Sequence, residues 1–208
     1  MPTSTDLSPG HFARLLLVAG GVYLAAQPKL YRDGVVMLVP REAEDRTRDT
    51  LDTMGDALGK WLKGQFIAMV LVGTMVSLGL WLLGVPSALA LGLLAGLGEF
   101  VPLVGAVATA IPALLAASTV DMWTVLYVLV LYIVIQQIEG NVIMPIIQSE
   151  MVSLAPALAL FAVVAFGLLF GILGVIFATP LTVVAYVAVK KLYVEAGLGK
   201  PAPKDKPS

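Results

Sequence analysis

Two acidic residues, Glu99 and Glu139, lie in a stretch of 125 residues, 65–189, that contains no lysine and no arginine. Glu99 belongs to GEFVPLVG (98–105) and Glu139 to QQIEGNVIMP (136–145). An ionisable side chain at membrane depth costs about 2.5–3.5 kcal/mol even on lenient insertion scales, so it indicates a functional site. A buried carboxyl group without a cation nearby can exchange a proton near neutral pH. The chemistry that these residues predict is therefore proton exchange.

Further polar and helix-breaking residues accompany both carboxyl groups. Burying polar groups without partners costs several kcal/mol, so we expect these side chains to meet water, one another or a substrate. The alternative is that both clusters only satisfy helix ends at a membrane interface, as we expect for Asp121 and Glu150. The candidate substrate-binding residues are Glu99, Pro102, Gly105, Gln136, Gln137, Glu139, Asn141 and Pro145, and the candidate hairpin breaks are Gly98, Gly171, Gly174 and Pro180.

The composition indicates an integral membrane protein. Of 208 residues, 59% are hydrophobic and 13% charged, and the mean hydropathy is +0.93, whereas soluble domains have about 25% charged residues. The net charge of −1 gives no reason to expect a nucleic-acid partner. The absence of cysteine excludes disulfides and thiolate metal sites. We find no GxSxG, HExxH, P-loop or nucleotide-binding motif, and we expect no enzyme activity, no cofactor and no metal site.

The elements that position these residues are predicted to be helices. An apolar run, 15–26, precedes a basic region, 28–63, which holds seven of the thirteen lysines and arginines. Within that region a stripe at helical spacing predicts an amphipathic helix leading into the membrane; it consists of Leu51, Met54, Leu58, Leu62 and Phe66. Phe66–Leu83 and Met122–Ile138 are predicted to span the bilayer.

The region from Pro86 to Pro112 is too short to cross the membrane twice. GEFVPLVG divides its 27 residues into two arms of roughly 18–20 Å each, against a hydrocarbon core of ~30 Å. A similar pattern follows Pro156, with a break at 170–174. We therefore predict an all-α polytopic membrane protein with spanning helices and two broken, re-entrant helical hairpins. The hairpins form an internal repeat, predicted to be inverted.

The expected organisation follows from these elements. An N-terminal tail with a short membrane helix covers 1–30, a cytoplasmic amphipathic segment 31–63, the first repeat 64–119, the second repeat 120–195, and a disordered tail 196–208. Basic residues flank the apolar region on both sides, which predicts that 28–63 and the C-terminus are cytoplasmic.

Residues 15–190 resemble the C-terminal part of the AI-2E family of transporters, the autoinducer-2 exporter superfamily. The resemblance rests on four stretches: LVPREAEDRTRDTLDTMGDALGKWLKGQ, LLGVPSALALGLLAGLGEFVPLVGAVATAIPALLA, IVIQQIEGNVIMPII and GILGVIFATPL. The hairpin signature P-x-x-G-x6-P is met by Pro102, Gly105 and Pro112. The family's N-terminal helices would precede the point where this sequence begins.

The resemblance implies a homo-oligomeric transporter in a bacterial inner membrane. It would export a small solute or signalling molecule such as autoinducer-2, with sodium or proton antiport in some members. The partners expected are this small-molecule or ion substrate and the lipid bilayer. The alternatives are a passive oligomeric pore, in which Glu99 would ring the opening, and a truncated membrane scaffold that transports nothing.

Overall fold

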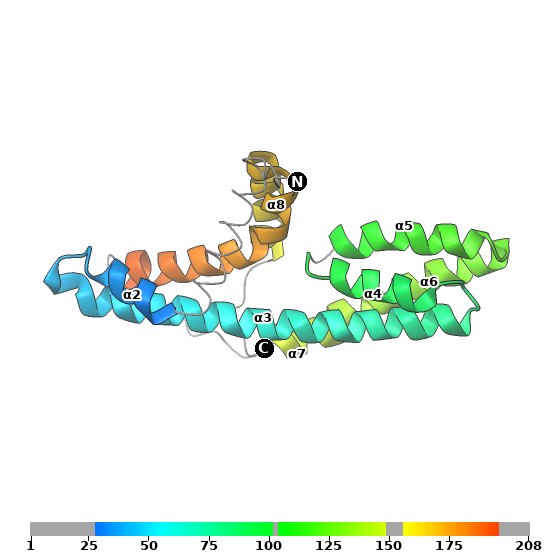
Figure 1. Cartoon of the computed structure of the whole chain (residues 1–208), viewed down its shortest axis with the longest axis horizontal. Coiled ribbons are helices and arrows are strands. Elements are labelled where there is room, and N and C mark those ends of the chain that lie inside the picture. The colour runs from blue at the N-terminus through cyan, green and yellow to red at the C-terminus, as the bar shows by residue number, and fades with distance from the viewer. Residues whose placement is uncertain (1–27, 102–103, 149–155, 196–208) are drawn as a thin grey trace, which may run out of the picture. The chain divides into compact units, whose positions relative to one another are not determined.

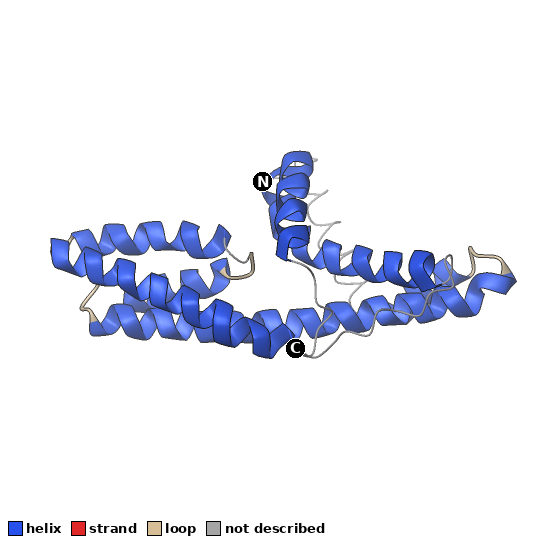
Figure 2. Cartoon of the chain, turned by 180° about the vertical axis from the view of Figure 1, so that it is seen from behind, coloured by secondary structure: helices blue, strands red, loops and turns tan. Residues whose placement is uncertain are grey.

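The computed structural model describes residues 28–101, 104–148 and 156–195. Helices joined by short turns make up this part of the chain, and it contains no strand (Figures 1 and 2). The all-α class predicted from the sequence is confirmed. The apolar run at 15–26 and the tail at 196–208 lie outside the described residues.

The chain divides into two compact units, Met1–Asp52 and Thr53–Ser208. The first unit contains α2 (Pro28–Val36) and a short 3₁₀ turn, η1 (Arg41–Ala43). Arg32 donates to the carboxylate of Asp52 at 2.6 Å. This ion pair is exposed, and pairs of this kind contribute about 0–1 kcal/mol to stability.

Helix α3 (Glu44–Leu82) continues the predicted amphipathic helix into the first span without interruption. The C-terminal end of the predicted apolar stripe does not pack against the protein, because Leu62 is 46% exposed and Phe66 is 66% exposed. The buried face instead contains Trp61, Gln65 and Ala68. Where a helix enters lipid, apolar side chains can face outward at no cost, so hydrophobicity no longer marks the packed face.

Helix α3 ends in a Schellman motif. The backbone N–H of Val85 donates to the carbonyl of Leu80 at 3.0 Å, and that of Gly84 to the carbonyl of Trp81 at 3.1 Å. Gly84 has a φ of +70°, which glycine adopts without steric cost. Val85 and Leu80 are both buried and belong to one apolar cluster. The turn therefore reverses the chain and directs α4 back along α3.

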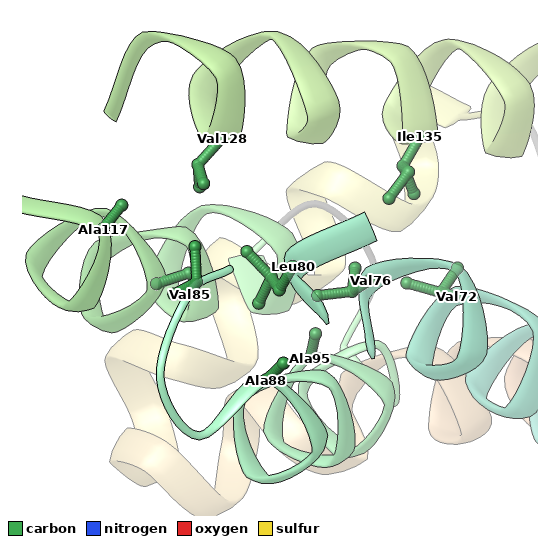
Figure 3. Close-up of a cluster of buried hydrophobic side chains, with 10 residues drawn as sticks. Val72, Val76, Leu80, Val85, Ala88, Ala95, Ala117, Val128 and Ile135 are labelled. Carbon is green, nitrogen blue, oxygen red and sulfur yellow. The ribbon is translucent and has the colours of Figure 1, made fainter. Parts of the chain in front are cut away.

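Helices α4 (Ala88–Gly98), α5 (Val104–Ser118) and α6 (Met122–Ile138) pack with the C-terminal half of α3. Figure 3 shows the core that they share, in which valines and Leu80 of α3 meet small residues of α4 and α5 and apolar residues of α6. Small residues allow close contact, since Gly73 on α3 faces Gly92 and Gly96 on α4. Close approach of this kind is typical of helices packed within membranes.

The break predicted at GEFVPLVG is confirmed, because α4 ends at Gly98 and α5 begins at Val104. The expectation that Pro112 closes this unit is wrong: Pro112 lies inside α5, which continues to Ser118. At 1.5 Å per residue, α4 is about 16 Å long and α5 about 22 Å. Both are shorter than a hydrocarbon core of ~30 Å, and their re-entrant placement remains a prediction.

The helix disruption expected near Gly140 and Pro145 takes the form of a π turn, and the helix does not end there. A single π-helical turn, η2 (Glu139–Ile143), follows α6 and leads into α7 (Met144–Gln148). Met122–Ile147 thus forms one apolar helix. A π turn absorbs one extra residue, which changes the direction of the following side chains without ending the helix.

Helix α8 (Pro156–Ala188) has a kink at Gly171, whose φ of +63° and ψ of −145° are not helical. A Cβ on Gly174 would overlap the carbonyl of Phe166, so the two arms of α8 touch at the kink. The break predicted at 170–174 is therefore confirmed. A π-helical segment, η3 (Val189–Glu195), follows.

Three helical segments in the described ranges are long and apolar enough to cross a membrane: Arg41–Leu82, Met122–Ile147 and Leu160–Tyr193. Many large apolar side chains on them are exposed in the isolated chain, including Trp81 at 69% and Leu168 at 84%. Exposed apolar side chains of this kind are suited to contact with the lipid of a membrane rather than with water. The protein is a multi-pass membrane protein.

We predict that Gly92→Ala destabilises the packing of α3 on α4. A Cβ at this position would overlap the side chain of Ser77 and lie 2.6 Å from its backbone nitrogen. Overpacking of this kind costs about 1–3 kcal/mol, which thermal unfolding in detergent would detect. Gly59→Ala is the matched control, because a Cβ on Gly59 meets nothing within 4 Å. Equal unfolding temperatures for the two variants would contradict the close packing.

A second prediction concerns the N-cap of α6, where the carboxylate of Asp121 accepts from the backbone N–H of Thr124 at 2.8 Å. This hydrogen bond, with a second from the Thr124 hydroxyl, lowers the pKa of Asp121. The stabilisation is therefore present above the ordinary aspartate pKa of about 3.9 and is lost as the pH falls through the lowered value. We expect Asp121→Ala to lower the unfolding temperature at neutral pH and to change it less in acid. A difference that stays constant with pH would exclude the carboxylate as the cap.

Candidate functional site

The buried faces of four helices carry a few polar residues in otherwise apolar stripes. On α3 the stripe contains Gln65, Ala68, Val72, Val76 and Leu80. On α4 it contains Ala88, Gly92, Ala95 and Glu99, on α5 Gly105, Thr109, Ala113 and Ala117, and on α6 with η2 Thr124, Val128, Ile135 and Glu139. Spacings of three, four or seven residues keep each stripe on one helix face. Glu99, Thr109 and Glu139 line one cavity, whereas Thr124 lies near the start of α6.

Glu99 is the C-cap residue of α4 and is completely buried. Its backbone stays helical, with a φ of −62° and a ψ of −14°. Among the described residues, no N–H or O–H donor reaches either carboxyl oxygen of Glu99. A buried polar atom without a partner costs about 1–3 kcal/mol, and more if charged, so this group is an exception that calls for a functional explanation.

Glu139 brings the second carboxyl group to the same place. It is 4% exposed, and its Oε2 accepts a hydrogen bond from Nε2 of Gln136 at 3.0 Å. Glu99 and Glu139 line the same small cavity. The structure thus joins two carboxyl groups that are forty residues apart in the sequence.

The remaining polar residues of QQIEGNVIMP point away from this pair. Gln137 and Asn141 are exposed, and the Asn141 side chain donates to the Gln137 carbonyl and to its side-chain oxygen, at 2.8 and 3.0 Å. Pro145 is exposed as well. The expectation that Gln137, Asn141 and Pro145 share a site with Glu139 is therefore not supported by their placement, because the helix turns them to its opposite side.

A small cavity separates the two carboxyl groups from the apolar core. Its volume is about 10 Å³, and Val72, Ala95, Thr109, Tyr132 and Gln136 contribute to its walls together with both glutamates. A cavity needs about 10–15 Å³ to hold one water molecule. In this conformation the cavity has room for a proton or about one water molecule, but not for an organic solute.

The tip of the α4–α5 hairpin is held by a small set of contacts. The Gln65 side chain on α3 donates to the backbone carbonyl of Glu99 at 2.5 Å. The ring of Phe100 packs edge-on against Trp61, with ring centroids 5.7 Å apart. The Tyr132 hydroxyl on α6 donates to the carbonyl of Thr109 at 3.3 Å. The first two contacts hold the end of α4 against α3, and the third holds α5 against α6.

Two glycines bring the arms of this hairpin together. A Cβ on Gly105 would overlap the carbonyl of Gly98, so backbone touches backbone at this point. Gly98 and Gly105 therefore shape the hairpin, and a role of Gly105 in substrate binding remains a prediction. Pro102 lies outside the described residues. Gly171, Gly174 and Pro180 belong to α8, and none of them lines the cavity.

Sequence reasoning missed Gln65, Thr109 and Tyr132, which complete the surroundings of the pair. The available signal was that each interrupts a stripe of small or apolar residues at helical spacing. A second hollow, of about 560 Å³, runs between α3 and α4. It is lined mainly by apolar residues such as Phe66, Leu89 and Leu93, and it lies open, as expected of a surface that faces lipid.

Comparison with known proteins gives relatives that are all named for transport. The chain is 32% identical over 162 residues to "Putative transport protein YrrI" of Bacillus subtilis, which covers 78% of this chain and 46% of the relative. It is 30% identical over 169 residues to a protein of Thermotoga maritima with the name "Putative transport protein" (81% and 52%). It is 32% identical over 133 residues to "Putative permease PerM" of Escherichia coli K12 (62% and 37%).

The chain spans about half the length of these curated relatives. Residues 7–194 match the sequence profile that is described as AI-2E family transporter. This match covers nearly the whole chain and includes both glutamates and both helix breaks. The chain belongs to the AI-2E family of transporters.

Proposed function

We propose that this chain carries the transport site of a secondary transporter that exports a small polar solute in exchange for a cation. The observation that supports the proposal is the carboxyl pair of Glu99 and Glu139, which is buried, cation-free and placed beside a break between short helices. Ionisable groups inside a membrane commonly mark ion or substrate paths, and interrupted helices commonly form transporter sites.

The proposal also covers the charge of the substrate and the membrane in which the protein lies. No lysine or arginine lies between 65 and 189, so the site favours a neutral polar molecule or a cation over an anion. An autoinducer-2-like signalling molecule, polar and small, has this chemistry and fits the family. We place the protein in the bacterial inner membrane as a homo-oligomer with a cytoplasmic C-terminus, because basic residues flank the apolar region on both sides.

The hairpin supplies a mechanism for alternating access. The cavity at the carboxyl pair is too small for a solute, so the α4–α5 tip must move away from α6 before the solute enters. In the described part of the chain, Gln65, Trp61 and Tyr132 contact the hairpin. Phe100 at its tip also packs against an apolar cluster that includes Val183 and Val187. Movement of one short hairpin against the spanning helices then exposes the site to one side of the membrane.

We predict that Glu99→Gln and Glu139→Gln each reduce export about ten- to a hundredfold. The reason is that a hydrogen bond to a charged group contributes about 1.5–3 kcal/mol, and 1.4 kcal/mol is a factor of ten. Uptake of autoinducer-2 into inverted membrane vesicles, driven by an imposed pH gradient, measures this loss. Glu42→Gln is the matched control, since Glu42 is exposed on η1 and far in sequence from the site.

The same assay tests the alternatives. A passive pore would give uptake in wild type that does not depend on the gradient. A scaffold would give no uptake above vesicles that lack the protein. Unchanged, gradient-driven uptake in both glutamine variants would contradict the assignment of the site.

A further inference from the structure

Among the described residues, no donor reaches the carboxyl oxygens of Glu99, and the neighbouring polar side chains donate elsewhere. The Thr109 hydroxyl donates to the carbonyl of Gly105 at 2.9 Å, and the Tyr132 hydroxyl to the carbonyl of Thr109. The Gln65 amide donates to the backbone of Glu99, not to its carboxyl group. The Gln136 amide donates to Glu139. What faces the carboxyl oxygens of Glu99 is therefore the other carboxyl group.

The titratable groups that face Glu99 are few. From α6 and η2 these are Tyr132 and Glu139, while α3, α4 and α5 contribute only neutral side chains to the cavity wall. No lysine, arginine or histidine lines the cavity. Two ionised carboxylates that line one small buried cavity without a cation repel each other strongly. One proton between them replaces the repulsion by a short, charge-assisted O–H···O bond.

Such a proton belongs to the pair rather than to either residue. The pair links two elements, since Glu99 ends α4 and Glu139 begins η2. Proton loss would thus change an attraction between the hairpin and α6 into a repulsion. The observed cavity of about 10 Å³ is consistent with the protonated, closed form.

We propose that Glu99 and Glu139 bind one exchangeable proton jointly, and that its release unseats the tip of the α4–α5 hairpin from α6. In this step the O–H bond of the pair breaks and the proton passes to water that enters the opened cavity. Both groups are then ionised carboxylates. The inference rests on the proposed transport function. It deepens that proposal by naming the proton as the coupling ion and the hairpin tip as the gate.

The absence of cysteine makes the movement directly measurable. Val107→Cys on α5 and Val134→Cys on α6 lie on exposed faces, at 64% and 47% exposure, and accept spin labels. The labelled protein is placed in vesicles of phosphatidylethanolamine and phosphatidylglycerol. We expect the distance between the labels to lengthen by about 5 Å, one helical turn, from acidic to alkaline pH.

The variants separate the proton from other causes of movement. In Glu99→Gln the new amide can donate to Glu139 at every pH, so the short distance should persist in alkali. Asp121→Asn removes an exposed carboxyl group at the other end of α6 and should keep the wild-type response. A distance that does not change with pH in wild type, or an equal change in Glu99→Gln, would overturn the proposal.

A second measurement does not depend on the labels. The infrared C=O band of a protonated carboxylic acid differs from that of a carboxylate, and wild type should show the intensity of one buried acid per chain near neutral pH. Glu99→Gln and Glu139→Gln should each lose this band, and Asp121→Asn should retain it. An intensity of two acids, or none, would contradict a shared proton.

The outcomes also separate this inference from the transport function. If solute export persists in a protein that lacks the pH-dependent movement, the gate is refuted and the proposed transport function stands. A pH-dependent movement in a protein that exports no solute would refute the transport function and leave the proton site.

Discussion

Two carboxyl groups buried in one small cavity, whose described lining contains no cationic side chain, are the constraint on which this structure depends. In a membrane protein most of the surface can be apolar, so hydrophobic burial specifies little about which faces meet. Burial of Glu99, in contrast, is costly unless its partner is placed beside it. The seating of α4 and α5 on α6 is therefore tied to the protonation of a single pair. A group with this influence on packing is suited to control a movement.

Small residues make this arrangement possible. Gly73, Gly92 and Gly96 bring α4 close to α3, and Gly98 touches Gly105 where the hairpin closes. These contacts place the C-terminal end of α4 within the core instead of at its edge. A bulkier hairpin would hold the carboxyl group of Glu99 farther from Glu139. The glycines and the carboxyl pair thus act together. Close packing at the glycines positions the carboxyl group of Glu99, but dispersion contacts alone could not stabilise that group in the core.

Much of the fold and the central carboxyl pair could be predicted from the sequence, because both depend on residue types that stand out from their neighbours. Proline and glycine marked the breaks after Gly98 and at Gly171, and the isolation of Glu99 and Glu139 marked the site. The partners of these residues were not predictable in the same way. In lipid, apolar side chains occupy inner and outer faces alike, so the apolar stripe that ends at Phe66 did not identify the packed face, and Gln65 was overlooked. The division of QQIEGNVIMP into inward and outward residues likewise depended on a π turn that composition does not reveal.

The π turn has a consequence for the site. It begins at Glu139, immediately after α6, and the backbone N–H of Met144 donates to the carbonyl of Glu139 across the wider turn. Pro145 follows without ending the helix. Because π turns are often found at functional sites, where they redirect side chains, Glu139 can face the cavity while Asn141 faces outward. The carboxyl pair thus joins two irregular helix segments, the end of α4 and the start of η2. Both irregular segments lie at the carboxyl pair, where a change in the charge of the pair would act directly on the packing of the two helices.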